Sequence, residues 1–125
     1  MAYTDGMSEE TKQRIVQELV PGKQITLAHI IANPDKELYI KLGMNPNIDY
    51  AKSAIGVMTI SPAETAIIIA DIAMKAAGVE IGFVDRFSGS LIVTGTVSEV
   101  EASTNAILDY VEHKLGFTVC EITRT

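Results

Sequence analysis

Short apolar runs rich in β-branched residues divide this sequence into blocks, and glycine, proline, asparagine and serine separate the blocks. Runs of this kind predict β-strands. The predicted strands cover residues 24–31, 54–60, 79–84, 91–97 and 117–123. The third and fourth runs are joined only by residues 85–90, so these two strands are predicted to pair as a hairpin.

Three helices are predicted from the residues that begin and end them. The first spans residues 34–42, the second residues 63–77 and the third residues 98–115. The expected cap and stop residues are Asn33 and Gly43 for the first helix, Ser61 with Glu64 and Gly78 for the second, and Ser98 with Glu101 and Gly116 for the third. Ser61 and Ser98 each precede a glutamate by three positions, which is the pattern of a capping box. Pro34 and Pro62 stand where a missing N–H costs nothing.

This order of elements predicts an α+β fold. Strands and helices do not alternate regularly, and the hairpin interrupts them, which favours an antiparallel or mixed sheet with helices on one face. The length of 125 residues suits one domain, placed at residues 23–125, behind an N-terminal segment of residues 1–22. Within that segment, residues 9–20 fit either a helix capped by Ser8 or a short strand over residues 14–20.

The second predicted helix has almost no polar face. Glu64, Asp71 and Lys75 are its only charged residues, and alanine, isoleucine and methionine fill most other positions. A surface helix normally shows a wide polar side. We therefore expect this helix to be covered on a second side by another copy of the chain.

Composition and charge exclude several classes of function. The net charge of −6 argues against nonspecific binding to nucleic acid or to an anionic membrane, since both require clustered lysine and arginine. The start of the chain is polar, and no apolar run reaches the ~18 residues that span a bilayer. A single cysteine suits a reducing compartment. A cytoplasmic protein is expected.

The residues that could carry chemistry are scattered. Cys120 lies in a predicted strand without a base beside it, so a buried structural thiol is the simpler interpretation. His29 falls in an apolar run and His113 near the end of a helix, and together with Cys120 they lack the spacing of metal ligands. Asp85-Arg86 is interpreted as a surface or interface ion pair. The sequence thus predicts neither an enzyme nor a bound metal or cofactor.

Several segments resemble the shell proteins of bacterial microcompartments. They are residues 54–59 (AIGVMT), 70–79 (ADIAMKAAGV) and 88–93 (SGSLIV). Two further segments, residues 20–29 (VPGKQITLAH) and 82–89 (GFVDRFSG), resemble the circularly permuted branch found in ethanolamine-, propanediol- and choline-utilisation compartments. The resemblance covers nearly the whole chain. It implies a circularly permuted, ferredoxin-like shell domain that forms homo-hexamers, tiles with other shell proteins around encapsulated enzymes, and passes small metabolites through a central pore.

The resemblance also assigns roles to particular residues. It implies that an N-terminal strand from each subunit joins a β-barrel over the central axis, which favours the strand over the helix for residues 14–20. This barrel strand comprises Arg14, Ile15, Val16, Gln17, Glu18, Leu19 and Val20. Lys75 matches the family's lysine at the edge between hexamers. The pore candidates, in the turn that matches the family's pore loop, are Phe87, Ser88, Gly89 and Ser90.

One feature of the family is missing, and two other classes of function remain open. The edge arginine that follows a proline after a strand has no counterpart in residues 31–35, so flat tiling is not assured. A ferredoxin-like regulatory domain would bind a small molecule at a subunit interface and would be stabilised by it. A small enzyme would use Cys120 or Asp85-Arg86 and would lose activity on Cys120→Ser.

Overall fold

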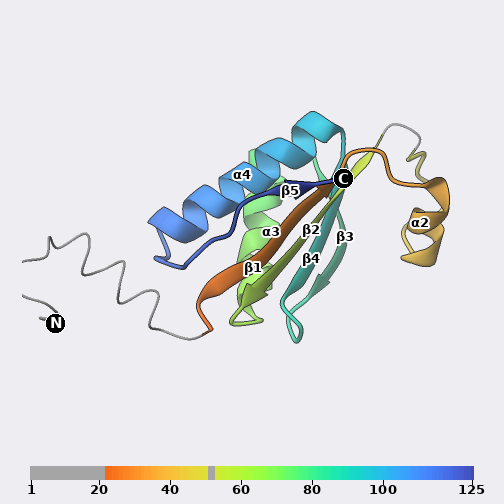
Figure 1. The fold of residues 1–125 in the computed structure, drawn as a ribbon. Coiled ribbons are helices and arrows are strands. Elements are labelled where there is room, and N and C mark those ends of the chain that lie inside the picture. Colours follow the sequence, from red (N-terminus) through yellow and green to blue (C-terminus); the bar gives the residue numbers. More distant parts are fainter. Residues whose placement is uncertain (1–21, 51–52) are drawn as a thin grey trace, which may run out of the picture.

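Two long helices cover one face of a five-stranded sheet, and a short helix projects from one end of it (Figure 1). The computed structural model describes residues 22–50 and 53–125. The strand order is β3-β4-β2-β1-β5, and all neighbours are antiparallel except β1 and β5, which run parallel. This mixed sheet with helices on one face confirms the predicted α+β class.

The elements follow the predicted order closely. They are β1 (Gln24–Ile31), α2 (Lys36–Lys41), β2 (Ala54–Ser61), α3 (Thr65–Ala76), β3 (Glu80–Asp85), β4 (Ser90–Gly95), α4 (Val97–His113) and β5 (Thr123–Arg124). The bounds of β1 are those predicted. The β3–β4 hairpin is confirmed too, with Asp85 opposite Ser90.

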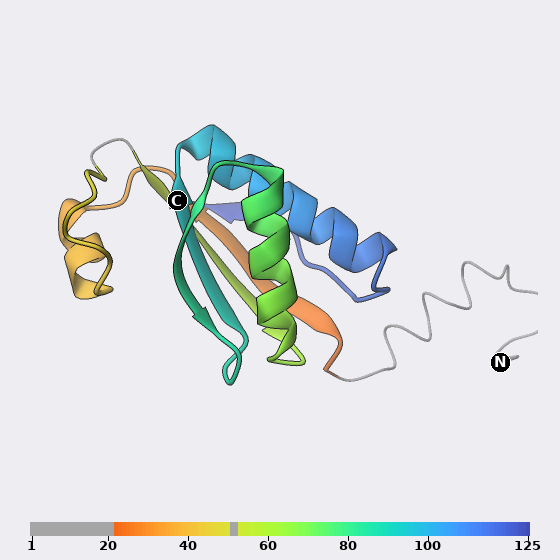
Figure 2. The same ribbon diagram turned by 180° about the vertical axis from the view of Figure 1, so that it is seen from behind.

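The core lies between the sheet and the helices α3 and α4 (Figure 2). Alternate residues of β2 point toward the helices, and Met58 and Ile60 are almost fully buried there. Ile69 from α3 and Ile107 from α4 complete the same cluster. Burial of a large aliphatic side chain contributes about 1.5–3 kcal/mol, so this alternation fixes which face of the sheet the helices cover.

The sheet has two distinct ends. Gln24 lies opposite Ser61, and Thr59 lies opposite Ser90, so the start of β1 and the 85–90 turn share one end. This end is called the turn end. At the other end Ile31 lies opposite Ile55, and both α2 and the C-terminal end of α3 are found there (Figure 1). This end is called the α2 end.

The first two helices begin later than predicted. Asp35, not Asn33, caps α2, and its Oδ1 accepts a hydrogen bond of 2.9 Å from the Glu37 amide. The chain is still tied to the sheet at Ala32, whose amide donates to the Thr125 carbonyl, so it turns into the helix only afterwards.

The capping box predicted at Ser61 is wrong as well. Ser61 is the last residue of β2 and pairs with Gln24. The first turn before α3 is closed by backbone bonds instead, from the Thr65 amide to the Pro62 carbonyl and from the Ala66 amide to the Ala63 carbonyl, both 3.0 Å.

A capping box does precede α4, but two residues earlier than predicted. Thr96 accepts from the Glu99 amide, and the Glu99 carboxylate accepts from the Thr96 amide. The strand therefore stops at Gly95 rather than Val97. At the far end, α4 stops at His113 instead of Leu115, and Gly116 follows with a φ of 72°, the left-handed conformation expected of a glycine that ends a helix.

The final strand is much shorter than predicted. Only Thr123–Arg124 pair with β1, apart from one isolated bridge between Gln24 and Thr118. Between these points Val119 and Cys120, which are neighbours in sequence, both pack against the core. The expected alternation of inward and outward residues therefore fails, because apolar burial rather than strand pairing holds this stretch, residues 117–122, along β1.

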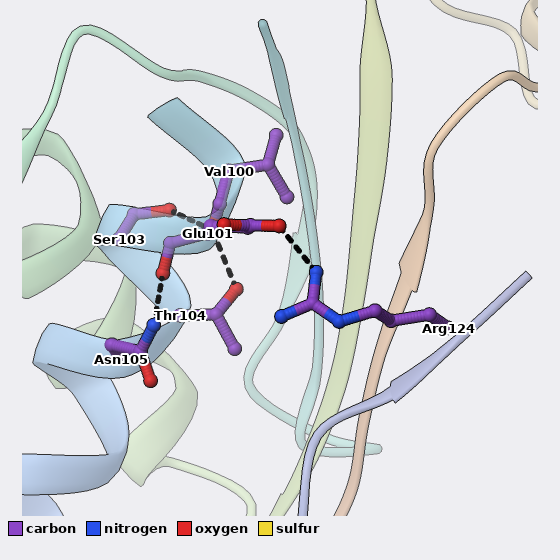
Figure 3. Close-up of polar contacts among 6 residues, drawn as sticks. All are labelled: Val100, Glu101, Ser103, Thr104, Asn105 and Arg124. Carbon is purple, nitrogen blue, oxygen red and sulfur yellow. Dashed lines mark hydrogen bonds and ion pairs between the residues drawn. The ribbon is translucent and has the colours of Figure 1, made fainter. Parts of the chain in front are cut away.

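Polar contacts fasten the end of the chain to the rest of the domain. Arg124 of β5 donates a hydrogen bond to the carboxylate of Glu101 on α4 and forms an ion pair with it (Figure 3). On the same turn of α4, the Val100 carbonyl accepts from the hydroxyls of Ser103 and Thr104. On β1, the His29 ring nitrogens lie 2.6 and 2.8 Å from the hydroxyls of Thr123 and Thr125.

Candidate functional site and assembly surfaces

The 85–90 turn holds the four pore candidates in an ordered loop at the turn end of the sheet. Asp85 organises this loop, because its Oδ1 accepts from the Phe87 amide at 2.9 Å and its carbonyl accepts from the Gly89 amide at 2.9 Å. The bond from the Phe87 amide, with one from the Ser88 hydroxyl, lowers the pKa of the Asp85 carboxyl. The carboxylate thus stays ionised at neutral pH and keeps the turn in shape.

The side chains of this loop face solvent. Phe87 is 80% exposed, and the Arg86 guanidinium lies 5.0 Å from the centre of its ring. The hydroxyl oxygens of Ser88 and Ser90 lie 3.0 Å apart. The loop thus presents one aromatic ring, one guanidinium group and two hydroxyls. Its single carboxylate, that of Asp85, accepts a hydrogen bond from the backbone of the loop.

The backbone conformation and surroundings of Gly89 leave no room for a side chain. Its φ is +76°, and a Cβ there would lie 2.1 Å from the carbonyl oxygen of Ile60. The Ile60 amide in turn donates to the Gly89 carbonyl at 2.8 Å. The turn is therefore pressed directly against the end of β2, which fixes where the pore candidates stand relative to the sheet.

Lys75 lies in the last turn of α3, at the α2 end of the molecule. Its side chain is 76% exposed, and its Nζ lies 2.8 Å from Oδ2 of Asp71, one helical turn earlier. The hydrogen bond to Asp71 and the charge of that carboxylate raise the pKa of the Lys75 ammonium. The lysine is thus an exposed cation paired with an exposed carboxylate, and a pair of this kind is weak enough for the lysine to bind another acceptor instead.

The outer side of α3 is apolar and uncovered, as the sequence predicted. Ala66, Ile69 and Ala73 face the core, whereas Ile67 and Met74, seven residues apart on one flank of the helix, are 52% and 58% exposed beside the exposed Asp71–Lys75 pair. Phe83 and Val84 of the edge strand β3 are exposed as well. Exposed apolar side chains are typical of interaction sites where they gather on one surface.

The predicted barrel strand cannot be located. Residues 14–20 lie outside the described residues. Gly22 is the first described residue, and β1 begins two positions later at the turn end (Figure 1).

The residues considered as nucleophiles or metal ligands do not form a common site. Cys120 is half-buried against the core, and burial raises the pKa of its thiol, which makes it a poor nucleophile. His29 is engaged by two threonine hydroxyls, and His113 lies within ion-pair distance of Asp109 and Glu112 on its own helix. Within residues 22–50 and 53–125, no three His, Cys, Asp or Glu side chains gather as metal ligands, and no helix could cross a membrane.

One surface was not predicted from the sequence, a cavity beneath α2. The cavity measures about 590 Å³ and lies between α2 and the loop that follows it. A signal was present in α2 itself, because its adjacent apolar residues Tyr39 and Ile40 point about 100° apart around the helix and cannot both pack on the same side. Tyr39 is buried, and Ile40 is 76% exposed.

Comparison with known proteins identifies the architecture. The model of the BMC domain matches residues 54–123, which run from β2 through α3, β3, β4 and α4 to β5. The chain belongs to the BMC-domain family. The matched residues include both α3 and the 85–90 turn.

Relatives within the family are similar over nearly the whole chain. The bacterial microcompartment shell protein PduU of Salmonella typhimurium is 50% identical over 117 residues, which are 94% of this chain and 97% of PduU. Among solved structures, a flat hexamer of CutR is 49% identical, with a TM-score of 0.77, and covers 85% of this chain and 94% of CutR. A screw form of CutR with a pitch of 41.9 Å is 48% identical, with a TM-score of 0.76, and covers 84% and 100%.

The permuted arrangement is shared more widely. The fused permuted hexameric shell protein MSM0275 from the RMM microcompartment has the same fold at 21% identity, with a TM-score of 0.61 over 70% of this chain and 45% of that one. The fold and the family expected from sequence are therefore confirmed, and the chain is a microcompartment shell protein rather than a regulatory ligand-binding domain.

Proposed function

We propose that this BMC chain is a structural subunit that closes into rings of six, and that the rings tile into the shell of a bacterial microcompartment. Family membership and the hexamer formed by the 49%-identical CutR support this. The shell would stand in the bacterial cytoplasm, and its further partners would be other shell proteins and the enzymes inside. The subunit would separate the enclosed enzymes from the cytoplasm and admit small metabolites, and it would not catalyse a reaction itself.

The observation that carries the proposal is the separation of the candidate residues between the two ends of the subunit. The pore candidates 87–90 stand at the turn end, and Lys75 stands at the α2 end. A ring needs one end of each subunit at its axis and the other at its perimeter. We assign the turn end to the axis and the α2 end to the perimeter.

The same arrangement supports the barrel strand. Gly22 and Lys23 lead into β1 at the turn end, the same end of the sheet as the pore candidates. A strand formed by residues 14–20 would therefore begin near the axis, where six copies could pair with one another. Closing such strands into a barrel would remove their unpaired edges. The barrel would then stand over the pore and control access to it.

The first experiment measures the mass of the assembly. Size-exclusion chromatography with light scattering should give about six times the subunit mass of 13.5 kDa. Electron microscopy of the same sample at higher concentration should show sheets, tubes or screws built from rings. A subunit that stays monomeric at high concentration would contradict the proposal, because the apolar sides of α3 and β3 would then serve no partner.

Lys75 is proposed to bind carbonyl oxygens of the neighbouring ring. Lys75→Ala should leave the ring intact and reduce the number and size of the sheets or tubes seen by electron microscopy. Lys114→Ala is the matched control, since it removes an exposed lysine at the end of α4. Asp71→Ala removes the intramolecular acceptor and should not reduce lattice growth. Unchanged lattices with Lys75→Ala would exclude this role.

A further inference from the structure

The cavity beneath α2 is a preformed apolar hollow. α2 and the loop that follows it stand at the α2 end of the sheet (Figures 1 and 2), and the cavity is lined by their residues. Tyr39 and Met44 from its wall pack with Ile55, apart from the core cluster under α3 and α4. The lining residues of the cavity are Lys36, Tyr39, Ile40, Gly43, Met44, Asn45, Pro46, Ile48, Asp49 and Tyr50. Apolar side chains make up most of this wall, and Lys36 and Asp49 are its two charged residues.

The walls of the hollow are held firmly. The rings of Tyr39 and Tyr50 stack with their centres 4.3 Å apart and their planes 5° from parallel, which ties α2 to the end of the following loop. Met44 and Tyr39 pack on Ile55 of β2, and the Met44 amide donates to the Tyr39 carbonyl at 3.1 Å. The hollow therefore does not depend on an occupant for its shape.

A protruding side chain stands beside the hollow. Ile40 is one of the most exposed apolar side chains among the described residues, at 76%, and it forms part of the cavity wall. A knob and a hole on one patch are what a two-fold contact requires, because each copy then offers its knob to the hole of the other. The hollow has ample room for one isoleucine side chain, whose volume is on the order of 100 Å³.

Charge and position favour a second copy of this chain as the occupant. The chain carries a net charge of −6, so most of its surface repels another copy. The wall of the hollow has one residue of each sign and adds no net charge. The patch also lies at the α2 end, next to the perimeter assigned to Lys75, where residues 31–35 lack the arginine expected from the family resemblance.

We propose that Ile40 of a subunit in one ring inserts into the α2 cavity of a subunit in the laterally neighbouring ring. The α2 cavity of the first subunit receives Ile40 of the second in return. This two-fold apolar contact rests on the proposed function, since it joins rings that must already have formed. It supplies the lateral contact that Lys75 alone, a single exposed cation, would make weakly. Burying the two isoleucines and their holes excludes water from the seam between tiles.

The test separates ring formation from the contact between rings. Ile40→Asp places a carboxylate where the partner's apolar wall would be, and its ring should keep the wild-type mass by light scattering. Electron microscopy at matched concentration should show loss of extended sheets or tubes, with at least a tenfold rise in the concentration needed to form them. Ile40→Leu keeps an apolar knob and should retain assembly. Asn105→Asp, which adds the same charge on exposed α4, is the matched control.

Each other outcome overturns the inference in a recognisable way. Extended lattices with Ile40→Asp, folded as judged by circular dichroism, would show that the knob is not used. Dissociation of the ring in that variant would place the patch inside the ring instead of between rings. A bound small molecule in native mass spectra of the wild type, lost in Ile40→Trp rings that still tile, would make the hollow a ligand site. Failure of the wild-type chain to form rings would instead contradict the proposed function.

Discussion

Gly89 shows how a single residue can position a candidate pore. Its carbonyl accepts from the Ile60 amide, and its α-carbon lies so close to β2 that no side chain fits. Gly43 also has a positive φ, of 70°, but nothing lies within 4 Å of the place where its Cβ would stand. Substituting each glycine therefore distinguishes two free-energy costs. Gly43 tests the left-handed backbone conformation alone, and Gly89 adds the steric clash with β2.

Gly89→Ala is expected to destabilise the domain more than Gly43→Ala. A left-handed conformation costs a residue with a side chain about 1–2 kcal/mol. Gly43→Ala should lose about that much free energy of unfolding. Gly89→Ala should lose roughly 3 kcal/mol or more, because overpacking typically adds ~1–3 kcal/mol. Urea unfolding at one fixed protein concentration measures both. Equal losses would show that the turn yields without cost to β2.

The elements that could be predicted from sequence are those specified by local residues. β1 and the β3–β4 hairpin follow from apolar runs and from a turn that contains Gly89. The ends of the helices were predicted less well, because several serines, threonines and acidic residues compete for each cap, and tertiary ties decide among them. The Ala32 amide, held by the Thr125 carbonyl, moves the cap from Asn33 to Asp35, and the bonds between Glu99 and Thr96 place the capping box two residues closer to the N-terminus than predicted.

The remaining features depend on contacts between distant parts of the chain. The ion pair of Arg124 with Glu101 and the contacts of His29 with Thr123 and Thr125 join segments far apart in sequence, so no local pattern announces them. The α2 cavity depends in the same way on the Tyr39–Tyr50 stack. In the candidate site, the exposed apolar residues of α3 were predictable because so few charged residues occur along this helix, and they were predicted.

The outer side of α3 should hold neighbouring subunits together in the ring. Ile67→Ser with Met74→Ser removes two exposed apolar side chains while leaving the core-facing residues in place. Both side chains are already about half-buried in the single subunit. If the ring covers the rest, their loss should weaken association by about 1.5–3 kcal/mol, which corresponds to a roughly 10- to 100-fold higher dissociation constant. Light scattering over a dilution series measures this.

Val97→Ser is the control for that experiment, since Val97 is an exposed apolar residue at the start of the other long helix. It should leave the dissociation constant close to that of the wild type. A double variant that dissociates at the wild-type concentration would mean that another surface, such as the β3 edge with Phe83 and Val84, closes the ring.

At the scale of the whole molecule, the subunit has three kinds of exposed surface. The turn end carries a loop ordered by Asp85 and directed away from the sheet. The α2 end carries a cation at Lys75 and an apolar knob and hole around Ile40. The apolar sides of α3 and β3 lie between the ends. A single copy leaves all three exposed, and a tiled ring would use each for one purpose.

Removing residues 1–20 should open the axis without unfolding the domain. The core, both long helices and all five strands lie within the described residues, and Gly22 precedes β1. The truncated chain should therefore keep the circular dichroism spectrum of the full chain and still form rings. If the removed residues build a barrel over the pore, averaged electron-microscopy images of the truncated rings should lack density above the axis that full-length rings show. The 87–90 loop would then be the narrowest part of the opening. Global unfolding of the truncated chain would mean that residues 1–20 complete the domain instead of capping the ring, and unchanged axial density would place them elsewhere.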